Sequence, residues 1–191
     1  MSPTFLIVDN FYNKAEEVRK YALSLPFEKK GNYPGARTKG LSEPYFSNMR
    51  SYFEDLLSKK INYWPNDDNN TSFQYTTKDS SSWVHHDLTR WAAVLYMTPD
   101  APVDSGTAIY RHKESGISLW NPQDPKTEFN DRREITTDLS KWEQIISVGN
   151  IFNRLIVYRG EYYHKSILSG FGEDQFNGRL FQTFFFDTTG L

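Results

Sequence analysis

Residues 83–88, Trp-Val-His-His-Asp-Leu, decide how this chain is interpreted, because they contain a His-x-Asp pair. On a β-strand, residues i and i+2 project from the same face, so His85 and Asp87 point the same way while His86 points away. An isolated pair of this kind is more often a surface histidine beside a solvated aspartate. A register that uses His86 with Asp87 is disfavoured, because neighbouring strand residues face opposite sides.

A distant histidine changes the interpretation of this pair. His164 follows Asp87 much later in the chain, at the end of a strand-like segment. Two imidazoles and one carboxylate form the facial triad that suits non-haem Fe(II) and leaves coordination positions open for other ligands. The sequence therefore predicts a metal site made by His85, Asp87 and His164. A packing role is the alternative for His164.

One arginine lies at the start of the last aromatic segment. Arg179 follows His164 in the chain, and the apolar pair Leu180-Phe181 comes directly after it. A cation that enters such a strand needs a buried partner, and a guanidinium forms bidentate, charge-assisted bonds with a carboxylate. Thr183, four residues further on, shares the face of Arg179 on an extended strand and can donate another hydroxyl. The alternatives are a surface ion pair for Arg179 and an ordinary strand position for Thr183.

The composition limits the class of protein. The chain has 191 residues with 14 Phe, 12 Tyr and 5 Trp, which predicts one domain with a strand-rich core. Its formal net charge is −2 and it has no basic run, so nucleic acid is not expected as a partner. Without cysteine it has no disulfide or thiolate metal site. The apolar run 5–8 is too short for a signal peptide and no segment reaches transmembrane length, so we expect a cytoplasmic protein.

The N-terminal part of the chain, 1–70, is predicted to form a helical support region. A helix is expected from an N-cap at Asn13, with Glu16 as its capping-box partner, to Leu25, and Pro26 ends it. The other expected elements are a strand at 5–8, a second helix at 44–59 and loops at 30–42 and 66–70.

From residue 72 onward, short apolar runs separated by turn residues predict strands. Asp138 is expected to cap a short helix through Ile146, after a long polar loop at 121–137. Many short strands after two helices favour an α+β, mainly β fold, a double-stranded β-helix (jelly roll) flanked by N-terminal helices. We expect one domain over 1–191, with helical support at 1–70 and the jelly roll with its metal site at 71–191. The strands are expected at 73–77, 83–87, 92–97, 106–112, 154–158 and 180–186.

The order His-x-Asp, distal His, then Arg entering a final aromatic strand resembles the Fe(II)- and 2-oxoglutarate-dependent oxygenases, most closely their prolyl-hydroxylase-like branch. The resemblance covers residues 75–186 in matching order. The whole chain is further similar to small oxygenase-like proteins of bacteria and marine phages. Additional blocks that look like those of the family lie at 93–97, 105–108 and 153–158.

The resemblance implies ligands and an activity. His85, Asp87 and His164 would hold Fe(II), and Arg179 would anchor the far carboxylate of the co-substrate 2-oxoglutarate. With O₂, such an enzyme decarboxylates 2-oxoglutarate to succinate and hydroxylates a C–H bond of its substrate. The expected substrate is a peptide or a small molecule, with prolyl or other peptidyl hydroxylation as one option.

Two tyrosines match positions that bind the same carboxylate in related enzymes. Tyr75 lies ten residues before His85, and Tyr96 lies on the strand after the metal pair. Both can instead be ordinary core aromatics. Phe181 departs from the family pattern, which often has a small or hydroxyl residue there, and this affects the expected shape of the co-substrate pocket.

Two other functions fit the same residues. A metal-binding, cupin-like jelly roll without turnover would bind iron but form no succinate from 2-oxoglutarate. A metal-free structural or interaction domain would bind no Fe(II) specifically. The sequence predicts neither the substrate nor the oligomeric state.

Overall fold

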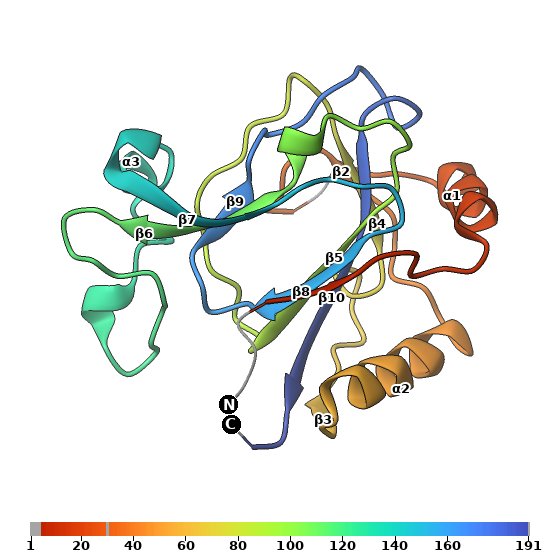
Figure 1. Ribbon diagram of the computed structural model, residues 1–191, viewed down its shortest axis with the longest axis horizontal. Helices are drawn as coiled ribbons and strands as arrows, with labels where there is room; N and C mark the ends of the chain where they lie inside the picture. Colours follow the sequence, from red (N-terminus) through yellow and green to blue (C-terminus); the bar gives the residue numbers. More distant parts are fainter. Residues whose placement is uncertain (1–4, 30, 191) are drawn as a thin grey trace.

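Two antiparallel β-sheets form the centre of the computed structural model, which describes residues 5–29 and 31–190 (Figure 1). The larger sheet has seven strands in the order β1-β8-β5-β10-β4-β2, with β3 also paired to β10, and the smaller has three in the order β7-β6-β9. The strands are β1 (Phe5–Val8), β2 (Ala36–Arg37), β3 (Ile61–Tyr63), β4 (Phe73–Thr76), β5 (Trp91–Tyr96), β6 (Thr107–His112), β7 (Trp142–Val148), β8 (Leu155–Arg159), β9 (His164–Ser166) and β10 (Arg179–Thr188). The helices are α1 (Ala15–Ser24), α2 (Tyr45–Leu57) and the single-turn α3 (Arg133–Thr136).

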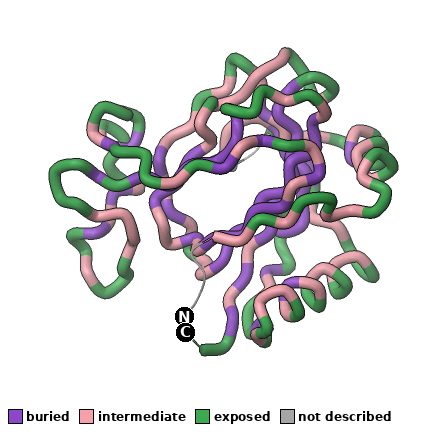
Figure 2. Tube along the Cα trace, viewed as in Figure 1, coloured by how far each residue is buried: buried purple, intermediate pink, exposed green. Residues whose placement is uncertain are grey.

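Helices α1 and α2 pack on one face of the larger sheet. Side chains alternate along β10, so Leu180, Phe184 and Phe186 join Ala22 of α1 and Phe53 of α2 in one apolar cluster. Figure 2 shows that buried positions are concentrated in the central strands β5, β8 and β10, whereas the helices are exposed along their outer side. The main core therefore lies between this sheet face and the two helices.

Phe53→Ala is expected to lower the free energy of unfolding by about 3–5 kcal/mol, because it opens a cavity in this core. The Phe53 ring centroid lies 5.1 Å from that of Phe184 and 4.9 Å from that of Phe186. Urea denaturation followed by circular dichroism measures the change. Phe176→Ala is the matched control: its side chain is 58% exposed, so a change below about 0.5 kcal/mol is expected. Equal losses in the two variants would contradict this placement of the core.

The smaller sheet packs against the opposite face of the larger sheet. Tyr96, Tyr158 and Phe181 project from β5, β8 and β10 into a second apolar cluster that includes Val148 of β7. The Tyr96 hydroxyl also donates a hydrogen bond to Thr107 Oγ1 on β6 at 2.9 Å. The predicted metal ligands His85, Asp87 and His164 meet on this side of the larger sheet.

The expected helix at 138–146 is wrong. The Asp138 side chain does accept a hydrogen bond from the Ser140 amide, but it caps only a single 3₁₀ turn. The chain then continues as β7, whose Trp142 and Val148 pair with the two ends of β6. Pairing with a strand that is distant in sequence outweighs a local capping signal here, because the segment gains a full ladder of hydrogen bonds.

The N-terminal region also departs from the expectation in detail. Helix α1 starts at Ala15 after Lys14 and has no side-chain cap, so the predicted capping box of Asn13 with Glu16 is wrong. The second helix matches the expected range closely. Residues 5–70 also contribute β1, β2 and β3 to the larger sheet, so this region is not purely helical. Among the described residues, no helix is both long enough and apolar enough to cross a membrane.

Candidate metal centre

His85, Asp87 and His164 come together between the sheets. Asp87 Oδ1 lies 4.0 Å from His85 Nε2, and Asp87 Oδ2 lies 3.3 Å from His164 Nε2. One ligand atom from each of the three residues lies within 4.8 Å of the others, so the group can hold one metal ion. Two imidazole nitrogens and a carboxylate oxygen form a donor set that suits a divalent transition metal.

Backbone pairing with β9 positions the ligands. Residues 83–87 were expected as a regular strand, but they form only an isolated bridge between His85 and His164. The His85 amide donates to the His164 carbonyl at 3.0 Å, and the His164 amide donates back at 2.7 Å. The Asp87 amide donates to the Gly160 carbonyl at 2.8 Å. The extended backbone therefore keeps the predicted i, i+2 relation without a full strand.

Both ligand imidazoles are oriented by backbone carbonyls. His85 Nδ1 lies 3.0 Å from the Trp83 carbonyl oxygen, and His164 Nδ1 lies 2.7 Å from that of Tyr162. A ring that donates its Nδ1–H to a carbonyl carries its lone pair on Nε2, the atom that faces Asp87 in both residues. The tautomers that metal binding requires are thus favoured by the protein itself.

The charge states also suit metal binding. Burial, followed by the neighbouring His164, lowers the pKa of His85 to about 4, so its ring is neutral near pH 7. Burial alone would raise the pKa of Asp87, but the neighbouring histidines, His164 first among them, outweigh burial and hold the pKa below its usual value. A neutral imidazole and an ionised carboxylate are the forms that coordinate metal.

His86 lies on the other side of the segment and does not join the triad. It is 3% exposed and stacks on Trp120 with ring centroids 4.2 Å apart. Its Nε2 lies 3.1 Å from Glu128 Oε2. Asn130 accepts from the His86 amide at 3.1 Å and donates to the His86 carbonyl at 3.0 Å. Sequence analysis missed this support, because no local pattern links two positions so far apart in the chain.

Asn130→Ala is expected to weaken metal binding by about 10-fold, because the residue holds the backbone between two ligands and does not touch the metal position. Competition titration with Co(II) or Ni(II) measures the affinity. Asn66→Ala, at an exposed position, is the matched control and should leave the affinity unchanged. An unchanged affinity in Asn130→Ala would show that the backbone of 85–87 needs no such support.

Arg179 is a buried cation in the same inter-sheet space. Its side chain is 1% exposed, and its Nε donates to the Ser105 carbonyl at 2.9 Å. The guanidinium lies 4.4 Å from the Phe181 ring centroid and 5.5 Å from that of Tyr96. Within 5–29 and 31–190, no carboxylate forms an ion pair with it. Burial lowers its pKa, yet an arginine stays charged, so the guanidinium can accept an anionic ligand.

Tyr158 is a site residue that sequence analysis missed. It is 3% exposed, and its ring packs edge-on against His164 with centroids 4.9 Å apart. Burial, then the charge of Asp87, raises the pKa of Tyr158 well above its usual value, whereas Arg179 lowers it. The phenol therefore lies within the fields of both the triad and Arg179, and it stays protonated. Alternation along 154–158 was the signal that places Tyr158 on this face.

Two of the predicted co-substrate residues, Tyr75 and Thr183, are not arranged to bind the co-substrate. Tyr75 pairs with Leu180 and packs on the helix face, where its ring centroid is 5.1 Å from that of Phe27. It therefore cannot share a carboxylate with Arg179, and that predicted role is wrong. Thr183 does share the face of Arg179, but its hydroxyl donates to the Asn69 carbonyl at 2.9 Å. Its predicted contact with the co-substrate is not supported, since its donor is already engaged.

A family model decides the classification of the chain. The model of DUF6445, a family of unknown function, matches residues 2–186. The chain belongs to the DUF6445 family. No curated protein sequence matches this DUF6445 chain.

Solved structures resemble this DUF6445 member over nearly its full length. HygX from Streptomyces hygroscopicus, with nickel, 2-oxoglutarate and hygromycin B bound, has a TM-score of 0.62 at 13% identity over 98% of this chain and 84% of HygX. A prolyl hydroxylase from Trichoplax adhaerens, in complex with a hypoxia inducible factor peptide fragment, has a TM-score of 0.59 at 12% identity over 96% and 83%. SnoN, a non-haem α-ketoglutarate-dependent epimerase of nogalamycin biosynthesis, has a TM-score of 0.55 at 13% identity over 94% and 76%. The DUF6445 chain thus shares its fold with these 2-oxoglutarate-dependent enzymes.

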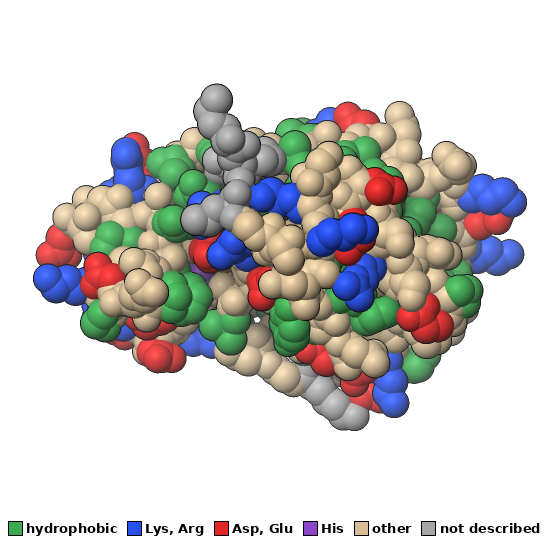
Figure 3. Space-filling model, turned by 90° about the horizontal axis from the view of Figure 1, so that it is seen from below, with side chains coloured by type: hydrophobic (Ala, Val, Ile, Leu, Met, Phe, Trp, Pro, Cys, Tyr) green, Lys and Arg blue, Asp and Glu red, His purple; other side chains and the backbone are tan. Residues whose placement is uncertain are grey.

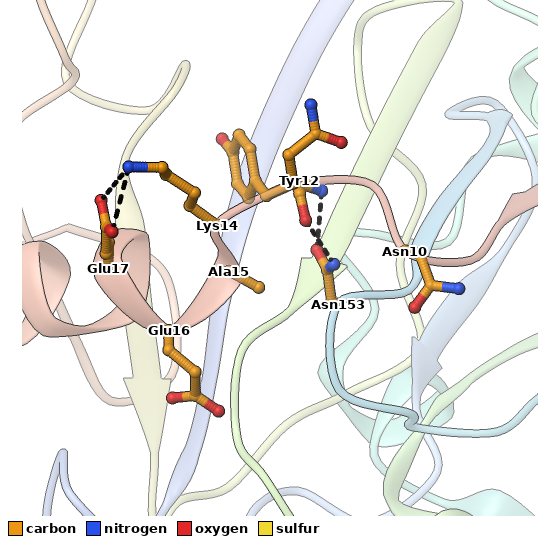
Figure 4. Close-up of a pocket in the computed structure, with 8 residues that line it drawn as sticks. Asn10, Tyr12, Lys14, Ala15, Glu16, Glu17 and Asn153 are labelled. Atoms are coloured by element: carbon orange, nitrogen blue, oxygen red, sulfur yellow. Dashed lines mark hydrogen bonds and ion pairs between the residues drawn. The ribbon is translucent and has the colours of Figure 1, made fainter.

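Another hollow lies at the start of α1 and is separate from the triad (Figure 4). It has a volume of about 530 Å³ and is lined by residues 10, 12–17 and 153. Two pairs of its residues contact each other: the Tyr12 amide donates to Asn153 Oδ1 at 2.9 Å, and Lys14 pairs with Glu17 at 3.1 Å. On the face in Figure 3, positive and negative side chains are interspersed. That nucleic acid is not a partner of this DUF6445 protein remains a prediction.

Proposed function

We propose that the chain is an Fe(II)- and 2-oxoglutarate-dependent dioxygenase that hydroxylates a C–H bond of a peptide or small molecule. The observation that carries the proposal is the pairing of a His-Asp-His triad with the buried guanidinium of Arg179, which has no carboxylate partner among the described residues. A structural domain has no need of a buried cation without a counter-ion, because such a group costs stability.

The donor set fits iron. His85, Asp87 and His164 would hold Fe(II) through two nitrogens and one oxygen, with the ring tautomers set by carbonyls. When bound, Fe(II) together with 2-oxoglutarate and O₂ supplies the oxidising chemistry of this enzyme class. Three protein ligands would leave coordination positions on a bound Fe(II) for other ligands.

The other residues would orient the co-substrate. Arg179 would bind the far carboxylate of 2-oxoglutarate, and Tyr96, whose phenol interacts with this guanidinium, would fix its orientation. Tyr158, whose ring packs against His164, would offer a further phenolic donor to the co-substrate. The ring of Phe181, whose centroid lies 4.4 Å from the guanidinium, would shield the pairing of Arg179 with a bound carboxylate from water.

The neighbouring folds support this class of chemistry. Structures similar to the chain hold nickel or iron and 2-oxoglutarate, with a small molecule in HygX and a peptide in the prolyl hydroxylase. SnoN is an epimerase, so its similarity supports the broader class of 2-oxoglutarate-dependent chemistry. Hydroxylation is therefore a more specific part of the proposal. A prolyl or other peptidyl residue is one candidate substrate.

We also propose a jelly-roll topology for a single domain. The small sheet β7-β6-β9 would be continued by residues 83–87 through the bridge between His85 and His164. Four strands would then face the strands β8-β5-β10-β4 of the larger sheet. The cluster that joins Ala22 and Phe53 to this sheet favours one folding unit.

An anaerobic titration with Fe(II) and then 2-oxoglutarate tests the proposal. A visible charge-transfer band that appears only when both are present is expected, followed by succinate formation once O₂ is admitted. Bound iron with no band and no succinate would favour a metal-binding module without turnover. No specific iron binding would overturn the proposed function.

A further inference from the structure

A second arginine lies on the site-facing side of the larger sheet. Arg37 of the edge strand β2 pairs directly with Gln74 of β4, which in turn pairs with Phe181 of β10. Residues directly opposite one another on adjacent strands share a face, so Arg37 lies on the same face as Arg179, which is two residues from Phe181. Arg37 therefore flanks the co-substrate space from the edge of the sheet (β2 in Figure 1).

The Arg37 guanidinium donates its hydrogen bonds to two side-chain amides. Its Nε and Nη2 donate to Gln74 Oε1 at 2.9 and 2.5 Å, and its Nη1 donates to Asn69 Oδ1 at 2.6 Å. Its Cζ lies 4.1 Å from the centroid of the Tyr33 ring. A guanidinium has five N–H donors, so two remain for a ligand. Over the described ranges, no carboxylate forms an ion pair with Arg37.

A cavity opens in front of this guanidinium. Its volume is about 230 Å³, enough for a group of several heavy atoms, and Arg37 lines it together with residues 26, 28, 31, 33, 38, 39, 68 and 69. Lys39 adds a second cation, while Glu28 and Asp68 add acidic groups to the wall. This mixture favours a singly charged carboxylate over a doubly charged phosphate, which the acidic groups would repel more strongly.

Electrostatics and a chain of contacts link the loop around Arg37 to the metal centre. Burial lowers the pKa of Arg37 to about 10, and the Asp87 carboxylate is among the charges that oppose this, so the two groups are within electrostatic reach of each other. Asn32, from the same loop, accepts a hydrogen bond from Arg133 Nη2 at 3.0 Å. Arg133 stacks on Trp83 with its Cζ 3.7 Å from the ring centroid, and the Trp83 ring lies 6.2 Å from that of His85. The loop that contains Asn32 is thus connected through Arg133 and Trp83 to the ligand His85.

We infer that Arg37 binds a carboxylate of the substrate, so the substrate class is a carboxylic acid such as an amino-acid derivative or a peptide with a free carboxylate. The inference rests on the proposed function, because it assigns the substrate of the same site. The Arg37 guanidinium is preorganised to bind one planar anion. Side-chain amides and the stacked tyrosine ring fix its orientation, and two of its N–H donors are free.

Protection of Arg37 from phenylglyoxal, measured by mass spectrometry on the full chain, tests the inference without turnover. The probes are N-acetyl-L-proline and N-acetyl-L-alanine, each compared with its amide, and inorganic phosphate. We expect the acids to slow modification of Arg37 and the amides to leave it unchanged. Arg111, an exposed residue paired with Glu143, is the internal control and should react equally with every probe. Equal protection by acid and amide, no protection by either acid, or stronger protection by phosphate would overturn the assignment.

Variants at Arg37 give an independent measurement. Arg37→Gln keeps hydrogen-bonding capacity but removes the charge, and the affinity for the protecting acid, followed by tryptophan fluorescence, should fall at least about tenfold. Arg37→Lys keeps the positive charge but not the planar guanidinium, so it should lose less affinity for the acid than Arg37→Gln.

Binding of 2-oxoglutarate should be unchanged in both variants, which separates this inference from the proposed function. An unchanged acid affinity in Arg37→Gln, with native circular dichroism, contradicts the inference. If 2-oxoglutarate does not bind the unmodified chain, the proposed function is wrong, whatever happens at Arg37.

Discussion

Asp87→Ala is expected to abolish metal-dependent turnover and to lower metal affinity by more than about 100-fold, while the chain stays folded. Outer-shell partners of a metal site typically contribute about 10- to 100-fold, and a direct ligand contributes more. Asp87 provides the carboxylate of the triad, with its oxygens 4.0 Å and 3.3 Å from the two histidine Nε2 atoms. Its side chain belongs to none of the apolar clusters, so its removal leaves the core intact. Calorimetric titration with Fe(II) or Ni(II), together with a succinate assay, measures both effects.

Asp55→Ala is the matched control for this variant. Asp55 is an exposed carboxylate on α2, so its replacement should change neither metal affinity nor turnover. Circular dichroism should give the same spectrum for both variants and the unmodified chain. Succinate production at an unchanged rate in Asp87→Ala would contradict the assignment of the triad.

Arg179→Met is expected to weaken 2-oxoglutarate binding at least about 30-fold with metal affinity unchanged. Truncating one partner of a buried, hydrogen-bonded charge pair costs about 2–5 kcal/mol, and 2 kcal/mol is about 30-fold in affinity. Arg179 is 1% exposed, so water cannot replace its contact with a carboxylate. The affinity follows from the charge-transfer band as 2-oxoglutarate is added to the Fe(II)-loaded chain. Arg179→Lys should give an intermediate loss, because it keeps the charge but not the planar fork.

The same variant has a second expected consequence. Without a co-substrate, Arg179 is a buried cation with no carboxylate partner in the described residues, which costs stability. Arg179→Met should therefore leave the Tm of the ligand-free chain unchanged or raise it. Arg111→Met, at an exposed ion pair, is the control and should change neither property. A parallel loss of metal affinity, 2-oxoglutarate affinity and Tm would instead indicate a misfolded chain.

The positions of the triad and of Arg179 followed from local sequence patterns. Alternation in an extended backbone places His85 and Asp87 together, even though residues 83–87 form only one bridge. Arg179 could be recognised because a charged side chain between apolar neighbours needs a special environment. Their roles as metal and co-substrate ligands stay predictions.

Sequence spacing alone misassigned Tyr75 and gave no signal for Tyr158. Tyr75 lies at a matching distance from His85, yet its strand turns it toward α1 and α2. Tyr158 has no such spacing signal, but β8 places it against His164. Which face of a strand meets the site depends on register and on the packing of both sheets, and spacing along the chain does not encode that.

The sequence by itself determined the mainly β character of the chain, its central strands and the set of residues able to bind a metal, because alternation and residue chemistry are local properties. Only the tertiary structure decided that 142–148 form a strand, that Asn130 and Tyr158 contact the metal-binding segments, and that Arg37 lies on the same sheet face as Arg179. These placements depend on contacts between segments far apart in the chain. Their energies come from pairing and burial that no short window of sequence contains.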